Sequence, residues 1–416
     1  MAMIGLEDVQ RARLALRGVV HNTPLQQSAT FSELSGADVY LKLENLQRTG
    51  SFKIRGAYNK ISLLTPEERA AGVVAASAGN HAQGVALAAR LAGIQATIVM
   101  PRFASLQKVM AVKGYGANLI LHGKDYGEAE EKAFEVQKQT GATFVHAFND
   151  PAIMAGQGTL GLEIIEAIPD VEVIVCPVGG GGLISGVATA VKAVKPDVRI
   201  VGVEPTGASK LPESLRKGTV VPLTSVNTIA DGLATRRVGT YNLEVIQKRV
   251  DDVVQVGDDE IASAILLLLE RAKTVVEGGG AASLAAVISG KVKGIEGKKV
   301  CTVLSGGNID VRLVDHIIQR GLVQTGRSLM LHTILEDKPG SLRDLLALLA
   351  ELQANVEAIE HDRTGLDIGV GQAEVRLKLD TRGHDHVAQI LATLAERGYK
   401  ARTLTPQMPG DKARAK

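Results

Sequence analysis

The sequence predicts an α/β protein with a second, smaller domain at its C-terminal end. Short apolar runs alternate with helical patterns from about residue 38 to residue 320. Such alternation is typical of a parallel sheet with helices on both faces. The pattern changes after Gly321, and residues 328–404 follow the order β-α-β-β-α-β of a ferredoxin-like unit. We therefore expect domains at 1–322 and 328–404, followed by a disordered tail at 405–416 that is rich in Pro, Gly and basic residues.

The expected strands of the first domain are short, apolar and often followed by glycine-rich or polar loops. These strands are Val39–Leu43, Val73–Ala75, Ala96–Met100, Leu119–Leu121, Phe144–Ala147, Val173–Val178, Ile200–Val203 and Val300–Leu304. Amphipathic helices are expected at His81–Leu91 and Leu183–Val194. Ligands of such folds bind beyond the carboxyl ends of the strands, so the loops found there are the candidate site.

The second domain has its own periodic pattern. Leucines at helical spacing predict a helix from Leu342 to Leu352, and Glu374–Asp380 alternates polar and apolar residues as a strand does. A second amphipathic helix is expected around Val387 and ends before Gly398. His384 and His386 stand at its start, where we expect solvated side chains and not metal ligands.

Composition excludes several classes of protein. Of the 416 residues, 45% are hydrophobic and 22% charged, and the net charge of +2 gives no electrostatic case for binding nucleic acid or an acidic membrane surface. Cys176 and Cys301 each lie in an apolar run, which indicates reduced, buried thiols in a cytoplasmic protein. The sequence shows neither a signal-peptide pattern nor an apolar run of membrane-spanning length.

The most informative loop is "CPVGGGGLISG", in which a buried strand runs into Gly179, Gly180, Gly181 and Gly182. A helix is expected from about Leu183. Glycines at that point leave backbone N–H groups bare at a helix N-terminus, which favours a phosphate ligand. The loop is no Walker motif and lacks the G-x-G-x-x-G spacing. Two alternatives remain: a dinucleotide site with Glu204 as its ribose-binding acid, and a glycine-rich turn without a ligand.

Two further loops follow strands. The first consists of Ser77, Ala78, Gly79 and Asn80. Ser77 or Asn80 could simply cap the next helix, or the loop could cradle a small anion such as a carboxylate. His81 suggests a general base, although one histidine at a helix start is more often structural. The third loop begins with Ser305, whose neutral hydroxyl can exchange one hydrogen bond with a ligand.

A lysine completes the candidate site. Lys53 lies in "GSFKIRGAYNK", between a small turn and a helix. A phosphate cradle, a carboxylate cradle, a neutral hydroxyl and an amine together suit a phosphorylated aldehyde cofactor that forms an imine with lysine. Pyridoxal phosphate is such a cofactor.

Four motifs strongly resemble one enzyme family. "SFKIRGA", "SAGNHAQG", "PVGGGGLISG" and "LSGGNID" resemble the fold-type II pyridoxal-phosphate enzymes, specifically the threonine ammonia-lyases, over about residues 5–320. The resemblance implies a tryptophan synthase β-like fold with two parallel-sheet subdomains. "EDKPGSL" resembles the ACT domain, a regulatory βαββαβ module that binds amino acids.

The resemblance also implies roles for individual residues. Lys53 corresponds to the catalytic Schiff-base lysine, Phe52 to the aromatic residue against the cofactor ring and Asn80 to the partner of its ring hydroxyl. Ser305 corresponds to the partner of the pyridine nitrogen. The phosphate loop corresponds to Gly179, Gly180, Gly181, Gly182 and Leu183, and the substrate contacts to Ser77, Ala78, Gly79, Asn80, His81 and Asn149.

The activity implied is deamination of L-threonine to 2-oxobutanoate and ammonia, with L-serine giving pyruvate. Ala78 stands where serine racemases carry a serine, so we expect weak racemisation. Lys210 stands where some relatives place an acid that binds a divalent cation together with a residue equivalent to Glu204. We therefore expect no metal site, because the ammonium group of Lys210 takes the place of the cation.

Other functions remain open at this point. One is a different pyridoxal-phosphate β-elimination or β-replacement, or a threonine synthase-like reaction. Another is a non-catalytic amino-acid sensor, against which the intact Lys53 argues. The ACT resemblance implies an amino-acid effector, isoleucine or valine, near Gly340, Ser341 and Leu342, and a homo-oligomer, most simply a tetramer. An ACT domain that only assembles the oligomer is the alternative.

Overall fold

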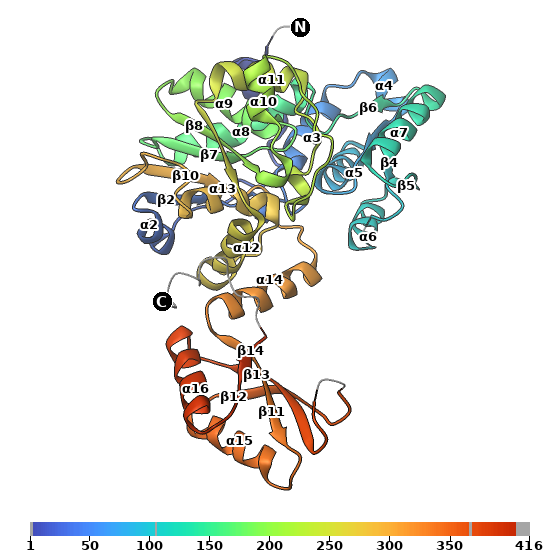
Figure 1. Ribbon diagram of the computed structural model, residues 1–416. Coiled ribbons are helices and arrows are strands. Elements are labelled where there is room, and N and C mark those ends of the chain that lie inside the picture. Colours follow the sequence, from blue (N-terminus) through green and yellow to red (C-terminus); the bar gives the residue numbers. More distant parts are fainter. Residues whose placement is uncertain (1–2, 105, 366–367, 405–416) are drawn as a thin grey trace. The chain divides into compact units, whose positions relative to one another are not determined.

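The structure is a computed structural model that describes residues 3–104, 106–365 and 368–404 (Figure 1). The chain divides into two compact units, Met1–Val311 and Arg312–Lys416. The expected boundary after residue 322 differs from this division, because helix α14 (Val311–Gln324) falls almost wholly in the second unit. The tail expected at 405–416 lies outside the described residues.

The first unit contains a large mixed sheet with strand order β1-β2-β10-β7-β8-β9. Only β1 runs antiparallel to its neighbour, and the other pairs are parallel. The strands are β1 (Leu25–Gln27), β2 (Asp38–Lys42), β7 (Val173–Pro177), β8 (Arg199–Pro205), β9 (Asp252–Val256) and β10 (Lys299–Val303). Apolar side chains of β7, α8 (Pro151–Ala167) and α9 (Gly182–Val194) form much of its core.

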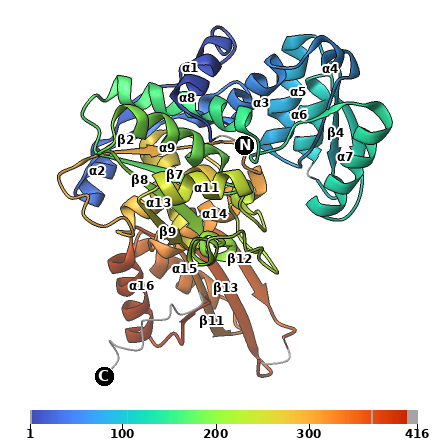
Figure 2. The same ribbon diagram turned by 90° about the horizontal axis from the view of Figure 1, so that it is seen from above.

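A smaller sheet lies to one side of the large one in Figure 2. Its four strands are all parallel, in the order β5-β4-β3-β6. They are β3 (Val73–Ala76), β4 (Ala96–Met100), β5 (Asn118–Leu121) and β6 (Thr143–Phe144). Two subdomain sheets, one mainly and one wholly parallel, confirm the fold class that the sequence predicts. The second core contains side chains from α3 (Lys53–Ser62), α5 (Asn80–Ala92) and β3.

The remaining helices of the first unit cover the sheets or connect them. They are α1 (Leu6–Ala15), α2 (Ala29–Ser35), α4 (Pro66–Ala71), α6 (Leu106–Gly114), α7 (Tyr126–Thr140), α10 (Leu211–Lys217), α11 (Thr240–Arg249), α12 (Asp258–Leu267) and α13 (Gly278–Ile288). Short 3-10 turns are η1 (Glu44–Leu46), η2 (Thr206–Ala208) and η3 (Asp231–Leu233), and η4 (Leu268–Ala272) is a π-helical turn after α12.

A buried ion network fixes helix α3, which begins at the candidate lysine. The Arg55 guanidinium is fully buried and donates to both carboxylate oxygens of Glu44, at 2.9 and 2.8 Å, and to both of Glu163, at 2.6 and 2.9 Å. Such bidentate pairs have a strict geometry, and losing one partner would leave a buried charge uncompensated. Helix α3 is thereby fixed to η1 and α8.

The second unit contains an antiparallel sheet in the order β12-β13-β11-β14. Its elements after α14 are β11 (Ser328–Glu336), α15 (Ser341–Glu351), β12 (Asn355–Asp362), β13 (Gln372–Asp380), α16 (His384–Glu396) and β14 (Arg402–Thr403). This order confirms the ferredoxin-like prediction. The two helices and the inward residues of β11 and β13 share one leucine-rich core.

One expectation for this unit is wrong in part. His384 is exposed, as expected, but His386 is buried. The ring of His386 bonds the Leu352 carbonyl through Nε2 at 2.8 Å and accepts from the Arg382 N–H at 3.1 Å. The sequence could not show this burial, because it depends on the end of helix α15 packing beside α16.

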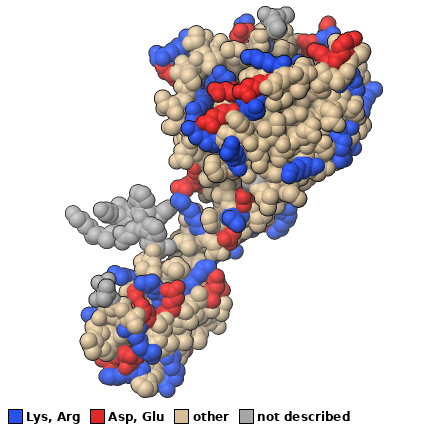
Figure 3. Space-filling model, turned by 90° about the vertical axis from the view of Figure 1, so that its right-hand side faces the viewer, with Lys and Arg blue, Asp and Glu red and all other residues tan. Residues whose placement is uncertain are grey.

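On the face seen in Figure 3, acidic and basic side chains are interspersed and neither sign forms a continuous surface. Among the residues that the structure describes, no helix combines the length and apolar character needed to cross a bilayer. Cys176 and Cys301 are both buried and free.

Candidate active site

A cavity of about 710 Å³ in the first unit brings the predicted loops together. It is lined by residues that follow β3, β7 and β10 and by the start of α3. The sequence-predicted residues that line it are Phe52, Lys53, Ser77, Ala78, Gly79, Asn80, His81, Gly179, Gly180, Gly181, Gly182, Leu183 and Ser305. Phe52 and Ser305, which lie 253 positions apart in the sequence, thus share one cavity because the carboxyl ends of the parallel strands meet there.

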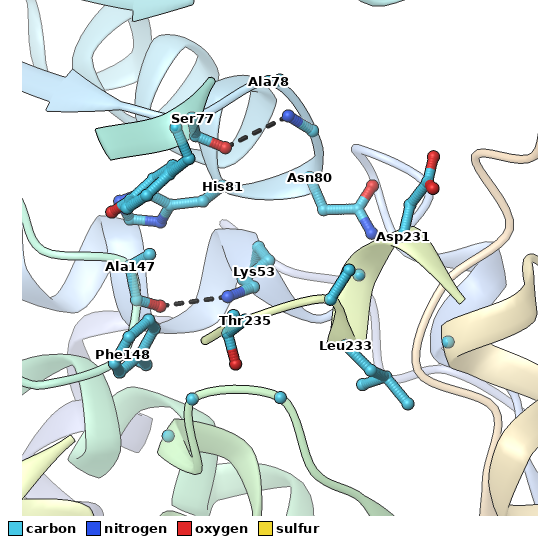
Figure 4. Close-up of a pocket in the computed structure, with 18 of the residues that line it drawn as sticks. Lys53, Ser77, Ala78, Asn80, His81, Ala147, Phe148, Asp231, Leu233 and Thr235 are labelled. Atoms are coloured by element: carbon cyan, nitrogen blue, oxygen red, sulfur yellow. Dashed lines mark hydrogen bonds between the residues drawn. The ribbon is translucent and has the colours of Figure 1, made fainter. Parts of the chain in front are cut away.

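Lys53 is the first residue of helix α3 and its amine faces the cavity. Its Nζ donates a hydrogen bond of 3.0 Å to the Ala147 carbonyl, as Figure 4 shows, and lies 5.2 Å from the centre of the Phe52 ring. Burial lowers the pKa of Lys53 to about 8, while the carboxylate of Glu277 acts in the opposite direction. At pH 7.4 a lysine with this pKa is neutral in about one molecule in five, against about one in a thousand for an ordinary lysine, and a nucleophilic or basic amine must be neutral.

The glycine loop connects β7 to helix α9. Gly181 precedes the first helical residue with φ of +95°, a conformation that side chains other than that of glycine rarely adopt, and a Cβ there would stand 2.9 Å from Asn242. No side chain caps α9. The helix start therefore presents bare N–H groups together with the positive end of the helix dipole, which suits a phosphate group.

The loop from Ser77 to Asn80 opens helix α5. Gly79 is the N-cap residue and no side chain caps the helix, so the capping explanation for Ser77 and Asn80 does not hold. The Ser77 hydroxyl instead accepts from the Gly79 N–H at 3.1 Å. In Figure 4 this loop stands on the opposite side of Lys53 from Thr235. A substrate carboxylate would find helix-start N–H groups here.

His81 and Asn149 are held by protein partners. The buried His81 ring bonds the Val145 carbonyl at 2.8 Å, and burial lowers its pKa to about 3, so the ring is neutral. This favours the structural reading of His81. Asn149 does not line the cavity: its Nδ2 donates to Thr240 Oγ1 at 3.2 Å, and its Oδ1 accepts from the Tyr241 N–H. A substrate contact by Asn149 stays a prediction.

Ser305 joins the loop after β10 to the lysine segment. It is nearly buried, and its hydroxyl donates to the Gly279 carbonyl at 3.3 Å. Its own carbonyl accepts from the Phe52 N–H at 3.1 Å. The hydroxyl thus lies at the cavity wall, carries no charge and is fixed relative to the residue before Lys53.

The sequence reasoning missed two groups of cavity residues. Glu277 precedes three glycines at the start of α13, and its Oε1 accepts from Asn80 Nδ2 at 2.6 Å. An acid before a glycine run was a usable signal. The other group lies between residues 222 and 237 and includes Asp231, which pairs with Lys108 at 3.1 Å. No local pattern identifies this segment, because only its long-range packing brings it to the cavity.

The Glu204–Lys210 pair lies at the carboxyl end of β8, and neither residue lines the cavity. Both side chains are completely buried, and Lys210 Nζ stands 3.0 Å from Glu204 Oε1 and 2.9 Å from the Ala208 carbonyl oxygen. The backbone N–H of Leu211 also donates to Glu204. Burial lowers the pKa of Lys210 and the Glu204 carboxylate opposes this shift. An ammonium group therefore lies between the oxygens that a cation would need.

The cavity fits pyridoxal phosphate by the chemistry of its walls. The uncapped glycine loop suits the phosphate, the neutral amine of Lys53 suits the aldehyde, and Ser305 offers a hydroxyl to a ring nitrogen. Asn80 has an amide N–H group available for a ring oxygen. Among the described stretches of the chain, no three His, Cys, Asp or Glu side chains gather as metal ligands do.

Known proteins share this architecture. Residues 16–306 match the family model of pyridoxal-phosphate dependent enzymes, and residues 330–399 match the ACT domain. An L-threonine ammonia-lyase of Thermotoga maritima is 52% identical over 96% of this chain and 99% of its own length. A catabolic L-threonine dehydratase of Staphylococcus aureus is 45% identical over 77% of this chain and 93% of its own. The solved structure of maize serine racemase is 38% identical, covers 78% of this chain and 99% of its own, and has a TM-score of 0.73.

Proposed function

The chain belongs to the pyridoxal-phosphate-dependent enzymes and, within them, to the threonine ammonia-lyases, and from this premise we propose that it deaminates L-threonine to 2-oxobutanoate and ammonia. The enzyme is a lyase that uses pyridoxal phosphate. We propose that Lys53 holds the cofactor, that the loop from Gly179 to Leu183 binds its phosphate, and that Ser305, Asn80 and Phe52 contact its ring.

The observation that carries this proposal is the state of the Lys53 amine. It is half-buried, burial lowers its pKa to about 8, and its hydrogen bond goes to the neutral Ala147 carbonyl. A carboxylate partner at hydrogen-bond distance would hold the amine charged, whereas a neutral acceptor leaves it able to lose its proton. Lys53 is thus suited first to bond an aldehyde carbon and then to accept a proton.

Bound pyridoxal phosphate withdraws electrons from the α-carbon of an amino acid joined to its aldehyde carbon. With the cofactor bound, Nζ of Lys53 would accept the α-proton of the substrate, because burial favours the neutral amine. The start of α5, with Ser77 and Gly79, orients the substrate carboxylate. The neutral Ser305 hydroxyl does not supply a charge that would hold a proton on a ring nitrogen, which favours prompt loss of the β-hydroxyl.

The decisive experiment is an assay with L-threonine as the sole amino acid. The purified protein with pyridoxal phosphate should release 2-oxobutanoate and ammonia in equal amounts, and L-serine should give pyruvate. Lys53→Ala is the control and should lose both turnover and the visible absorbance of the lysine-bound cofactor. Products formed only when a second substrate is added would favour β-replacement or a threonine synthase-like reaction. A wild-type protein that shows no Lys53-bound cofactor would favour an amino-acid sensor.

Racemisation of serine is a second candidate, because a solved serine racemase shares the fold. The residue that argues against it is Ala78, which lines the cavity without offering a hydroxyl. A racemase needs a proton donor on the face of the α-carbon opposite to Lys53. We therefore propose that elimination dominates over racemisation in this chain.

We propose that the ACT domain regulates the enzyme by binding isoleucine or valine near Gly340, Ser341 and Leu342, in a homotetramer with ACT contacts between chains. Helix α15 begins at Ser341 and no side chain caps it, so its N-terminus favours a carboxylate. Edge strand β12 leaves every residue but Val356 exposed, and such an edge favours pairing with another chain.

The two buried, free cysteines suit a reducing compartment, and we propose a cytoplasmic location.

A further inference from the structure

Glu277 has an unusual place for a residue that begins a helix. Its backbone N–H donates to the Gly306 carbonyl at 3.0 Å, and its carbonyl accepts from the Ala281 N–H at 2.9 Å. Its side chain does not cap α13. The carboxylate turns instead into the cavity, where Oε1 accepts from Asn80 Nδ2 at 2.6 Å. The backbone is thus fixed on both sides, while the side chain serves another loop.

Asn80 belongs to a series of hydrogen bonds in which each donor and each acceptor can be identified. Asn308 Nδ2 donates to the Thr49 carbonyl at 2.7 Å and to Asn80 Oδ1 at 2.7 Å. The Thr49 carbonyl only accepts, which fixes the orientation of the Asn308 amide. Asn80 must then present its oxygen to Asn308 and its nitrogen to Glu277, which as a carboxylate also only accepts. Asn308 on one side and Glu277 on the other therefore favour the same orientation of the Asn80 amide.

The local sequence makes room for this contact. A Cβ on Gly306 would stand 2.5 Å from Glu277 Oε1 and 3.1 Å from Asn80 Nδ2. Any other residue at position 306 would push the carboxylate and the amide apart. The glycine after Ser305 is therefore explained by the Glu277–Asn80 contact.

We propose that Glu277 is a positioning residue for the cofactor, which acts by holding the Asn80 amide with its nitrogen toward the carboxylate. One N–H of the Asn80 amide is used by Glu277, and the second is left to donate to the ring oxygen of pyridoxal phosphate. Without an acceptor at position 277, Asn308 alone would hold the amide, and an amide that turned would present its oxygen to that ring oxygen, which is repulsive. The inference rests on pyridoxal phosphate occupying the cavity, and not on which amino acid is deaminated.

The charged groups around Glu277 are Lys53, Lys108 and Asp231. Burial raises the pKa of Glu277 to about 7; the hydrogen bond from Asn80 and the charge of Lys108 oppose this shift, Asp231 reinforces it and Lys53 opposes it. The hydrogen bond from Asn80 thus stabilises the charged form of the Glu277 carboxyl, while Glu277 provides the acceptor for the Asn80 amide. A glutamine can replace the acceptor oxygen without the charge, which separates the two roles.

The test compares Glu277→Gln with Glu277→Ala by titrating the cofactor-free protein with pyridoxal phosphate. The cofactor dissociation constant should rise by about ten- to a hundredfold in Glu277→Ala, as expected for losing a hydrogen bond to a charged acceptor. Glu277→Gln should stay within about threefold of wild type, because the acceptor remains. The absorption band of the lysine-bound cofactor should shift in Glu277→Ala and not in Glu277→Gln. Equal losses in both variants would overturn the proposal.

A double-mutant cycle shows whether Glu277 acts through Asn80. In an Asn80→Ala background, Glu277→Ala should change the cofactor dissociation constant by less than about twofold. Fully additive losses would mean that Glu277 acts on the cofactor in another way, and would reject the positioning role. Should Glu277→Ala fail to fold, Asn308→Asp tests the same series of hydrogen bonds at the Asn308 side of Asn80. It replaces the donor to Asn80 by an acceptor, and an unchanged cofactor affinity would overturn the proposal.

The outcomes separate this inference from the proposed function. A wild-type protein that binds pyridoxal phosphate but leaves threonine unchanged would defeat the proposed function alone. Normal threonine turnover together with an unaltered cofactor affinity in Glu277→Ala would defeat the positioning role alone.

Discussion

Lys53 shows how burial can create a reactive side chain without a special partner. Its amine has a neutral carbonyl as acceptor, and its nearest opposing charge, Glu277, only partly offsets the effect of burial. The depressed pKa of Lys53 therefore comes from the cavity walls and not from one residue. An ordinary lysine, with a pKa of about 10.4, would be neutral in only about one molecule in a few hundred at pH 8.

The lowered pKa of Lys53 predicts how the rate of cofactor binding to this lysine depends on pH. Only the neutral amine attacks an aldehyde, so the rate at which the cofactor-free protein gains the visible absorbance of bound pyridoxal phosphate should rise with pH. The rise should have its midpoint near the Lys53 pKa of about 8 and level off above it. Stopped-flow absorbance between pH 6 and pH 10 measures this, with Lys53→Ala as the blank. A rate that still climbs tenfold per pH unit above pH 9 would contradict the depressed pKa.

Ala78 carries a second prediction at the scale of one residue. Ala78→Ser adds a hydroxyl on the loop opposite Lys53, and a proton donor on that face should raise the ratio of D-serine to pyruvate formed from L-serine by about tenfold or more. Ala78→Gly is the matched control, because it alters the loop without a hydroxyl. Chiral chromatography of the products gives the ratio. If the ratio is the same in both variants, a hydroxyl at this position is not sufficient for racemisation.

At the scale of elements, the site depends on loops whose shape is set by their contacts. The glycine loop is confined by Phe148, since a Cβ on Gly180 would stand 2.2 Å from the Phe148 ring, and by Asn242, whose Nδ2 donates to the Gly180 carbonyl at 2.6 Å. The loop is therefore held in one conformation. Its glycines are required both by the neighbouring side chains and by the phosphate that it is expected to bind.

Gly181→Asp tests the phosphate role of this loop. A carboxylate beside the phosphate should weaken cofactor binding by about 2 to 4 kcal/mol through like-charge repulsion in a partly desolvated cradle. Gly181→Asn has nearly the same shape as the Asp variant without its charge, so it reports the cost of the backbone strain and of the crowding against Asn242. Cofactor titrations of both variants give the difference. Equal affinities for the Asp and Asn variants would show that no phosphate lies near the loop.

The Glu204–Lys210 pair gives another prediction for the end of strand β8. Lys210→Met leaves the fully buried Glu204 carboxylate without its counter-ion, which should lower the free energy of unfolding by about 3 to 5 kcal/mol. Added Mg²⁺ or K⁺ should recover part of this loss, because Glu204 and the Ala208 carbonyl then offer oxygens to a metal ion. The double variant Glu204→Gln/Lys210→Met should lose less stability than Lys210→Met alone, and its stability should not depend on the added cation. Denaturant unfolding with choline chloride as the ionic-strength control decides this.

At the scale of the whole molecule, the sequence predicted the helices and strands better than the residues that line the cavity. Strand Ala96–Met100 and helix Leu183–Val194 were predicted to within one residue, because buried strands and uncapped glycine loops have strong local patterns. Strands β1 and β9 were missed, since one is only three residues long and the other lies partly exposed at the sheet edge. Residues 222–237 were also missed, because only long-range packing brings them to the cavity, whereas Glu277 was missed although it precedes a run of three glycines.

The second unit carries the last prediction, which concerns regulation. The ACT match covers residues 330–399, and a relative that matches only 77% of this chain is a catabolic L-threonine dehydratase. The 323 matched residues make up 93% of that relative, which is therefore shorter than this chain. We expect a chain truncated after Leu322 to keep threonine deamination and to lose its response to isoleucine and valine.

A second variant is needed beside the truncation, because the truncation removes most of the second unit and cuts within helix α14. In the full-length chain, Gly340→Asp places a carboxylate at the start of helix α15, where it should repel the effector carboxylate and weaken isoleucine binding at least about tenfold. Effector titrations of the deamination rate and calorimetric binding of isoleucine measure the two effects. By linkage, threonine or a non-reactive analogue should change the isoleucine affinity by the same factor as isoleucine changes that of the analogue. A truncated enzyme that responds to isoleucine as the full chain does would show that the ACT domain only assembles the oligomer.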